Sequence, residues 1–234
     1  MNNNNLTCVS GYWSVKNKHN NKFDSWFHKT LKLNCPYVFF CDKEMKNKIE
    51  KYREGLPTYY IECSIKDFVT KKYKDNMKID NSHCPSVELN LIWNEKIFLI
   101  KRAKEINPYL TDFFCWIDAG ICTYRDKMPP KESFPNELKL ERLPKDKLIY
   151  SASNIYNEAC VHKSLYYHHI SGTYILHKNA IEYFANLYDK YMEKLIDKNN
   201  IWTDQVIWTH IFKDHKDKFY KLCDGYGEII PYLY

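Results

Sequence analysis

The sequence predicts an α/β fold with a mostly parallel central sheet, and two observations support this. In the first half, short apolar runs alternate with amphipathic segments in the order β-α-β-α-β-α-β. Parallel strands need long crossover connections, which are usually helices, so this alternation favours a parallel sheet. Neither a linker-like segment nor an internal repeat interrupts the 234 residues. We therefore expect one domain over residues 1–234, with an irregular or disordered start at residues 1–5.

The first half supplies four predicted strands joined by helices. The apolar, β-branched and aromatic runs that predict strands are residues 6–13, 37–41, 58–63 and 113–118. Helical spacing of apolar residues predicts helices over 22–34, between Asp42 and Gly55, and over 87–106. Residues 64–85 are polar and rich in lysine, which predicts a loop with a short helix.

The second half is less regular. Residues 126–146 contain four prolines and many charges, which predicts an excursion over the surface. Strands are predicted at 148–153, 166–177 and 218–223, and a short aromatic helix at 203–212. The clearest helix is predicted over 178–196, where apolar side chains form one stripe.

Composition narrows the class of protein. The net charge of +6 comes from scattered lysines without a basic stripe, so we expect no nucleic-acid partner, although a phosphate-bearing ligand is compatible. The nine cysteines form no Cys-x-x-Cys pair, which argues against structural zinc. Their odd number and the polar start at residues 1–5 favour a reducing, cytoplasmic location, and no apolar run is long enough to span a bilayer.

Asp118 is the most informative candidate site residue. It ends an apolar run, Phe-Phe-Cys-Trp-Ile-Asp, and is followed by Ala119 and Gly120, which leave room for a ligand beside the backbone. Ligands of open α/β sheets collect beyond the carboxyl ends of strands, and a carboxylate there suits a hard cation. The alternative is that Asp118 caps the following turn.

Four further segments have both a functional and a structural interpretation. Ser10, Gly11 and Tyr12 end the first strand, where a nucleotide base could stack or a simple tight turn could form. Lys96 and Lys101, on the helix at 87–106, suit either a diphosphate or a solvated face.

Residues 168–173 and 203–205 are the other two segments. The glycine in Ser171-Gly172-Thr173 would allow a ligand to approach the backbone, whereas the adjacent His168 and His169 would point to opposite faces of a strand and so form a poor metal pair. Thr203 and Asp204 begin a helix, where either would act as a cap, although a carboxylate there could also serve as a general base.

Taken in order, these motifs resemble those of the HtrL/YibB family of glycosyltransferase-like proteins and, more broadly, GT-A nucleotide-sugar transferases. The resemblance covers roughly residues 6–215 and rests on Ile-Trp-x-x-Lys at 92–96, Trp-Ile-Asp-Ala-Gly at 116–120, Ser171-Gly172, an amphipathic helix and Thr-Asp-Gln-Val-Ile at 203–207. It implies a GT-A, Rossmann-like single domain with a mixed, mostly parallel sheet flanked by helices.

The resemblance also implies an activity: transfer of a sugar from a nucleotide-diphosphate sugar, with a UDP-sugar expected, to a hydroxyl of a glycan or other acceptor. Asp118 matches the first acid of the Asp-x-Asp motif that holds Mn²⁺ or Mg²⁺ on the donor diphosphate, but Gly120 stands where the second acid is expected. His210 and His215 are candidates for a further metal ligand, and Asp204 for the catalytic base.

The donor-binding residues that the resemblance and the strand ends imply together are Thr7, Val9, Ser10, Gly11, Tyr12, Lys96, Lys101, Trp116, Ile117, Asp118, Ala119, Gly120, Ser171, Gly172, Thr173 and Gln205. Because one acid of the pair is missing, the alternative is a non-catalytic GT-A-like protein that binds nucleotides or sugars. The oligomeric state is not predicted.

Overall fold

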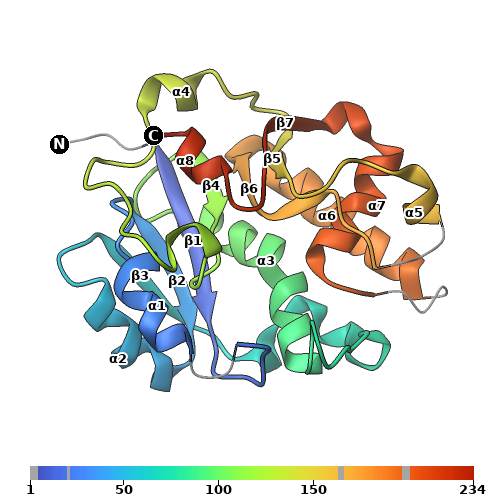
Figure 1. Cartoon of the computed structure of the whole chain (residues 1–234), viewed down its shortest axis with the longest axis horizontal. Coiled ribbons are helices and arrows are strands. Elements are labelled where there is room, and N and C mark those ends of the chain that lie inside the picture. The colour runs from blue at the N-terminus through green and yellow to red at the C-terminus, as the bar shows by residue number, and fades with distance from the viewer. Residues whose placement is uncertain (1–4, 20–21, 163–165, 197–200) are drawn as a thin grey trace.

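The computed structural model describes residues 5–19, 22–162, 166–196 and 201–234, so most of the predicted irregular start at 1–5 lies outside the described residues. The described residues form a seven-stranded sheet in the order β3-β2-β1-β4-β6-β5-β7 (Figure 1). The strands are β1 (Leu6–Tyr12), β2 (Tyr37–Cys41), β3 (Thr58–Glu62), β4 (Phe113–Trp116), β5 (Leu148–Ala152), β6 (Ile170–His177) and β7 (Phe219–Asp224).

All strand pairs are parallel except those made by β6, which runs antiparallel to both β4 and β5. The predicted α/β class with a mixed, mostly parallel sheet flanked by helices is therefore confirmed.

Helices cover both faces of the sheet. They are α1 (Phe23–Thr30), α2 (Lys43–Tyr52), α3 (Val87–Ile106), α4 (Glu137–Glu141), α5 (Glu158–His162), α6 (Lys178–Ile196), α7 (Asp204–Asp214) and α8 (Ile229–Tyr232). Because side chains alternate along a strand, neighbours such as Cys8 and Val9 enter different cores. Helices α3, α6 and α7 pack in the core that contains Val9, and α1, α2 and α8 in the core that contains Cys8.

The two longest helices, α3 and α6, have the predicted bounds, and local signals mark both ends of α3. The Ser86 side chain accepts a hydrogen bond from the Leu89 amide at the start of α3, and Asn107 adopts a left-handed conformation at its end. The predicted helix at 22–34 was too long, because α1 ends at Thr30, where Leu31 leaves helical geometry. The predicted strand at 166–177 likewise begins only at Ile170.

The single reversed strand brings distant segments to one edge of the sheet. Trp116 of β4 pairs with Val9 of β1 and with Tyr174 of β6. Because β6 runs in the opposite direction, Ser171 and Gly172, which precede Tyr174, lie beside the residues that follow Trp116. The carboxyl ends of β1 and β4 and the amino-terminal part of β6 therefore meet at this edge.

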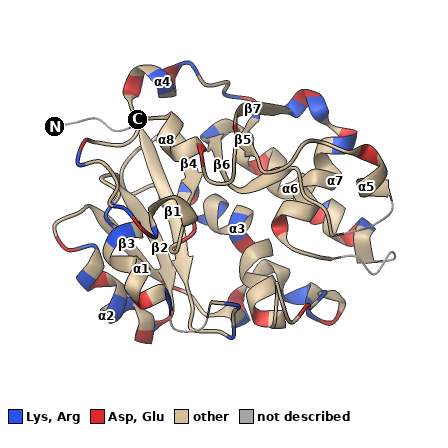
Figure 2. Cartoon of the chain, in the orientation of Figure 1, with Lys and Arg blue, Asp and Glu red and all other residues tan. Residues whose placement is uncertain are grey.

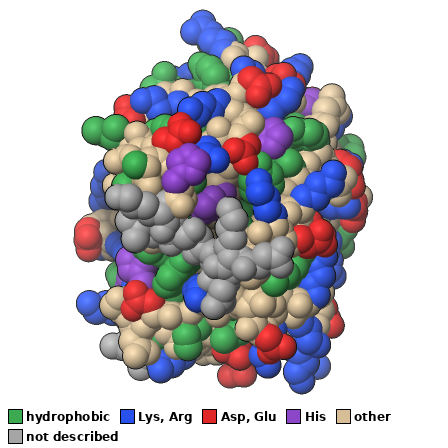
Figure 3. Space-filling view, turned by 90° about the vertical axis from the view of Figure 1, so that its right-hand side faces the viewer, with side chains coloured by type: hydrophobic (Ala, Val, Ile, Leu, Met, Phe, Trp, Pro, Cys, Tyr) green, Lys and Arg blue, Asp and Glu red, His purple; other side chains and the backbone are tan. Residues whose placement is uncertain are grey.

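Charged side chains are distributed over the whole molecule. Lysines, arginines and acidic residues are interspersed along the helices and loops (Figure 2), and the same mixture covers the face shown in Figure 3. Within the described ranges, no helix is both long and apolar enough to cross a membrane.

Candidate active site

A cavity of about 350 Å³ opens at this edge of the sheet. Its wall combines the ends of β1 and β4 with one face of α3 and the first turn of α7. On α3, the lining residues Leu89, Ile92, Trp93 and Lys96 follow the spacing of one helical face. Most of this face is apolar, and Lys96 extends it into the centre of the site.

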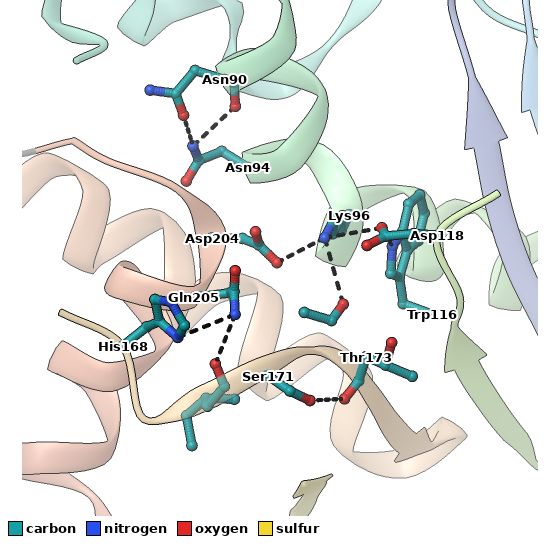
Figure 4. Close-up of polar contacts among 12 residues, drawn as sticks. Asn90, Asn94, Lys96, Trp116, Asp118, His168, Ser171, Thr173, Asp204 and Gln205 are labelled. Carbon is teal, nitrogen blue, oxygen red and sulfur yellow. Dashed lines mark hydrogen bonds and ion pairs between the residues drawn. The ribbon is translucent and has the colours of Figure 1, made fainter. Parts of the chain in front are cut away.

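Lys96 joins two carboxylates that are distant in the sequence (Figure 4). Its Nζ lies 3.1 Å from Asp118 Oδ1 and 3.1 Å from Asp204 Oδ2, and it donates a hydrogen bond of 3.4 Å to the carbonyl of Gly172. The Lys96 side chain is only 3% exposed. Burial lowers the pKa of Lys96, but the two carboxylates outweigh this effect and raise it above its usual value, so the ammonium stays charged.

Asp118 is fixed by the strand that precedes it. Its Oδ1 accepts a hydrogen bond of 2.7 Å from Trp116 Nε1, while its backbone carbonyl accepts one from the Ile121 amide and closes the turn. The side chain keeps 29% exposure and lines the cavity. The turn is therefore closed by the backbone, and the carboxylate is available to a ligand.

Asp204 is a buried carboxylate at the start of α7. It is 3% exposed, and burial, reinforced by the nearby charge of Asp118, raises its pKa to about 6 even though Lys96 acts in the opposite direction. Apart from the Lys96 ammonium at 3.1 Å, no described residue donates a hydrogen bond to Asp204 Oδ2. The Thr203 side chain makes no capping hydrogen bond, so the predicted capping role does not apply to that side chain.

Aromatic rings form much of the remaining wall. The lining includes Tyr12, Trp13, Phe23, Trp93 and Tyr166. Flat apolar rings of this kind provide stacking surfaces for nucleotide bases and sugar rings.

Two further cationic side chains, Arg125 and Lys18, face the cavity. The Arg125 Nε donates a hydrogen bond of 2.8 Å to the carbonyl of Gly120, and its guanidinium lies 3.9 Å from the centroid of the Trp26 ring. Arg125 is therefore held in a fixed position beside Gly120. Burial, and to a smaller extent the nearby charge of Arg125, lower the pKa of Lys18.

Two glycines in the site are required by close packing. A Cβ on Gly11 would lie 2.6 Å from the ring of Trp13, and one on Gly120 would lie 2.6 Å from the ring of Phe23. The space that a second acid would need at position 120 is therefore taken by an aromatic side chain.

The donor set does not fit a resident divalent cation between Asp118 and Asp204, because the Lys96 ammonium already occupies the position between them. Within the described part of the chain, no cluster of three or more histidine, cysteine or acidic side chains could hold a metal ion. The candidate ligands His210 and His215 are not among the residues that line the cavity. The predicted use of Mn²⁺ or Mg²⁺ stays a prediction.

Comparison with known proteins agrees with the resemblance seen in the sequence. A family model described as "Bacterial protein of unknown function (HtrL_YibB)" matches residues 62–228, which is more than half of the chain. The chain belongs to the HtrL/YibB family. No curated protein matches the sequence.

Among solved structures, the HtrL/YibB chain is similar to the apo form of the glycosyltransferase GlyE of Streptococcus pneumoniae TIGR4, with a TM-score of 0.46 and 10% sequence identity. The similarity covers 92% of this chain and 44% of GlyE, so the HtrL/YibB chain spans less than half the length of that protein.

The structure brings together about half of the predicted donor-binding residues. Those that line the cavity are Gly11, Tyr12, Lys96, Trp116, Asp118, Ala119, Gly120 and Gln205, together with the predicted base Asp204. Gly172 contacts Lys96 through its carbonyl.

The other predicted residues of this HtrL/YibB chain lie away from the cavity. Val9 and Ile117 are in the cores on opposite faces of the sheet, Ser10 and Thr173 are buried, and Lys101 pairs at 2.8 Å with Glu182 on the surface. Thr7 and Ser171 lie within 2.9 Å of the buried hydroxyls of Thr111 and Ser151, respectively.

Arg125, Trp93 and Tyr226 also line the cavity, although they were not predicted as site residues from the sequence. The spacing of three residues between Trp93 and Lys96 could have indicated Trp93, since both then lie on one helical face. No local pattern marks Arg125 or Tyr226, which reach the cavity from the loops that follow β4 and β7.

Proposed function

We propose that this HtrL/YibB chain is a glycosyltransferase that moves a sugar from a nucleoside-diphosphate sugar to a hydroxyl group of an acceptor such as a glycan. The observation that carries the proposal is Asp204, a buried carboxylate with a raised pKa that lines the cavity and contacts Lys96. Such a group is suited to accept a proton from an acceptor hydroxyl.

The proposed step is a displacement at the anomeric carbon of the sugar. The Asp204 carboxylate takes the proton of the acceptor hydroxyl, and the hydroxyl oxygen forms a bond to the anomeric carbon. The bond between that carbon and the diphosphate oxygen breaks, and its electron pair leaves with the nucleoside diphosphate. With Asp204 as the base, the attack comes from the face opposite the leaving group and inverts the anomeric configuration.

Cationic side chains support the departure of the diphosphate. Lys96, Arg125 and Lys18 line the cavity, and positive charge placed beforehand near a leaving group stabilises the negative charge that develops there. The pKa of about 6 for Asp204 is close to the optimum for a base at neutral pH, because the group is mostly ionised yet still basic.

Aromatic residues support a nucleotide-sugar as the ligand class. Tyr12, predicted from the sequence as a base-stacking residue at the end of β1, lines the cavity, and Trp93 faces the same cavity from α3. We expect UDP-sugars as donors, as the family resemblance implies.

Calorimetry with UDP, GDP and CMP, each with and without Mn²⁺, tests the donor class, and release of nucleoside diphosphate from sugar donors tests turnover. We expect Asp204→Asn to reduce turnover by about 10²- to 10⁴-fold while nucleotide affinity changes less than about fivefold. Asp214→Asn, at the far end of α7, is the matched control and should keep wild-type turnover.

Two outcomes would redirect the proposal. If none of the nucleotides binds, the chain is not a nucleotide-sugar transferase. If nucleotides bind, no donor is turned over, and Asp118→Ala keeps the affinity within a few-fold, the non-catalytic binding protein is the better description.

A further inference from the structure

Lys96 has the surroundings of a bound cation. Three oxygen atoms, from Asp118, Asp204 and the Gly172 carbonyl, lie between 3.1 and 3.4 Å from its ammonium nitrogen (Figure 4). The ammonium is almost completely removed from solvent, with 3% of the side chain exposed. Oxygen ligands with two negative charges around a buried centre are what a hard cation requires.

A divalent cation would compete for the same atoms. Mg²⁺ and Ca²⁺ bind oxygen at about 2.0–2.6 Å, closer than the ammonium lies to either carboxylate. To bind between Asp118 and Asp204, such an ion would have to displace Lys96 and then remain close to its positive charge. Asp118 Oδ1 already accepts a hydrogen bond from Trp116 Nε1, which further limits its use as a metal ligand.

Position 120, where a second acid is expected, also has no room for a side chain. At Gly120, a Cβ would contact the Phe23 ring, and the Gly120 carbonyl accepts a hydrogen bond from Arg125. The side of Asp118 on which another carboxylate would be expected therefore holds a fixed guanidinium instead.

We propose that the Lys96 ammonium takes the place of the divalent cation between Asp118 and Asp204, so that the chain binds a nucleoside diphosphate through its own cationic side chains without Mn²⁺ or Mg²⁺. Binding of a nucleoside diphosphate rests on the proposed function. The position of Lys96 between the two carboxylates does not, because it concerns only the charged residues of this chain.

The first experiment measures Mn²⁺ binding by electron paramagnetic resonance, with no nucleotide present. Wild type and Asp118→Asn should give the same weak binding. Lys96→Ala frees both carboxylates and should bind one Mn²⁺ at least tenfold more tightly than wild type, and this gain should disappear in Lys96→Ala/Asp118→Asn.

Lys72→Ala is the matched control. Lys72 also contacts two carboxylates, at 2.8 Å to Asp189 and 3.8 Å to Glu193, but its side chain is 47% exposed. Removing a lysine from solvated carboxylates should produce no tenfold gain, so the comparison separates a buried cation site from a general change in charge.

The inference is overturned if wild type binds one Mn²⁺ that Asp118→Asn loses, or if folded Lys96→Ala gains no Mn²⁺ affinity. Should Lys96→Ala fail to fold, Lys96→Gln replaces it. The Mn²⁺ affinities of wild type and Asp118→Asn then decide by themselves whether Asp118 holds a metal ion in the wild-type chain.

The second experiment measures UDP affinity in EDTA and in Mn²⁺, corrected for the Mn²⁺ that UDP binds in solution. We expect the two affinities to agree within about twofold, and a gain of tenfold or more in Mn²⁺ would overturn the inference. Absence of UDP binding under both conditions would instead contradict the proposed function, while the Mn²⁺ titrations would still decide the role of Lys96.

Discussion

Replacing Asp204 by asparagine should make the protein more stable while it removes the proposed base. Burial raises the pKa of Asp204 from 3.8 to about 6, which means that the charged carboxylate is less favourable in the folded chain than in the unfolded chain. Asparagine has nearly the same shape and carries no charge, so it avoids this cost.

The size of the effect follows from the two pKa values. Each pH unit between the folded and unfolded pKa corresponds to about 1.4 kcal/mol, so a pKa near 6 against 3.8 costs about 3 kcal/mol at pH 7. The folded pKa of about 6 already includes the lowering effect of Lys96, so no separate correction for that attraction is needed. The folded protein binds more protons than the unfolded chain between these values, so wild-type stability should decrease as the pH rises from about 4 to about 6 and change little beyond that.

Urea denaturation at pH 4, 5.5, 7 and 8 measures the prediction. The free energy of unfolding of Asp204→Asn should exceed that of wild type by as much as about 3 kcal/mol at pH 7 and 8, and by little at pH 4. An equal gain at every pH, or none at pH 7, would refute the reasoning.

Asp214→Asn is the control, because its expected change in the free energy of unfolding has the opposite sign. Partial burial acts to raise the pKa of Asp214, but the Tyr191 hydroxyl and Lys213 outweigh it and lower that pKa to about 2. Its ionised form stabilises the fold above the unfolded pKa, and that contribution is lost as the pH falls toward 2. The asparagine variant should therefore be less stable than wild type at neutral pH.

Three further predictions follow from the same geometry. Initial rates at saturating donor should fall about tenfold per pH unit below pH 6, because Asp204 must be deprotonated to act as a base, and a rate independent of pH between 4.5 and 8 would exclude that role. Gly172→Ala places a Cβ 3.2 Å from Lys96 Nζ and 3.2 Å from the Tyr226 hydroxyl, so turnover should fall at least about tenfold while calorimetry shows a melting temperature within a few degrees of wild type. Arg53→Met removes the guanidinium donor from four backbone carbonyls, of which those of Leu33 and Pro57 keep a backbone N–H donor. It should lower the free energy of unfolding by at least about 2 kcal/mol in urea, whereas a loss below about 1 kcal/mol would contradict this account.

Local patterns sufficed to predict much of the fold. The ends of α3 are marked by Ser86 and Asn107, and the apolar stripe of α6 repeats at helical spacing, so both helices have their predicted bounds. Asp118 was expected at the end of a strand, and it follows β4 by two residues. These features depend on residues that are close together in the sequence.

The direction of β6 and the partners of Lys96 depend on contacts between distant segments. An apolar strand looks the same in sequence whether it runs parallel or antiparallel, so the run at 170–177 could not reveal its reversal. Lys96 was predicted as a diphosphate contact, and its pairing with both Asp118 and Asp204 depends on how α7 packs beside α3. One local signal could have indicated that Lys96 is buried: it shares a helical face with the apolar residues that line the cavity.

The absence of an acid at position 120 and the burial of Lys96 are related, because both concern which charged side chains lie beside Asp118. The second carboxylate near Asp118 comes from Asp204 on α7, not from the turn after β4, because Phe23 fills the space beside Gly120. Two carboxylates held this close in a buried site need a positive charge between them. Lys96 supplies one of fixed position, and in doing so it sets the pKa of Asp204 low enough for the carboxylate to be mostly ionised at neutral pH. Removing Lys96 should therefore shift the acidic limb of the rate profile to higher pH, whereas a metal-dependent site would show that shift on removal of the metal.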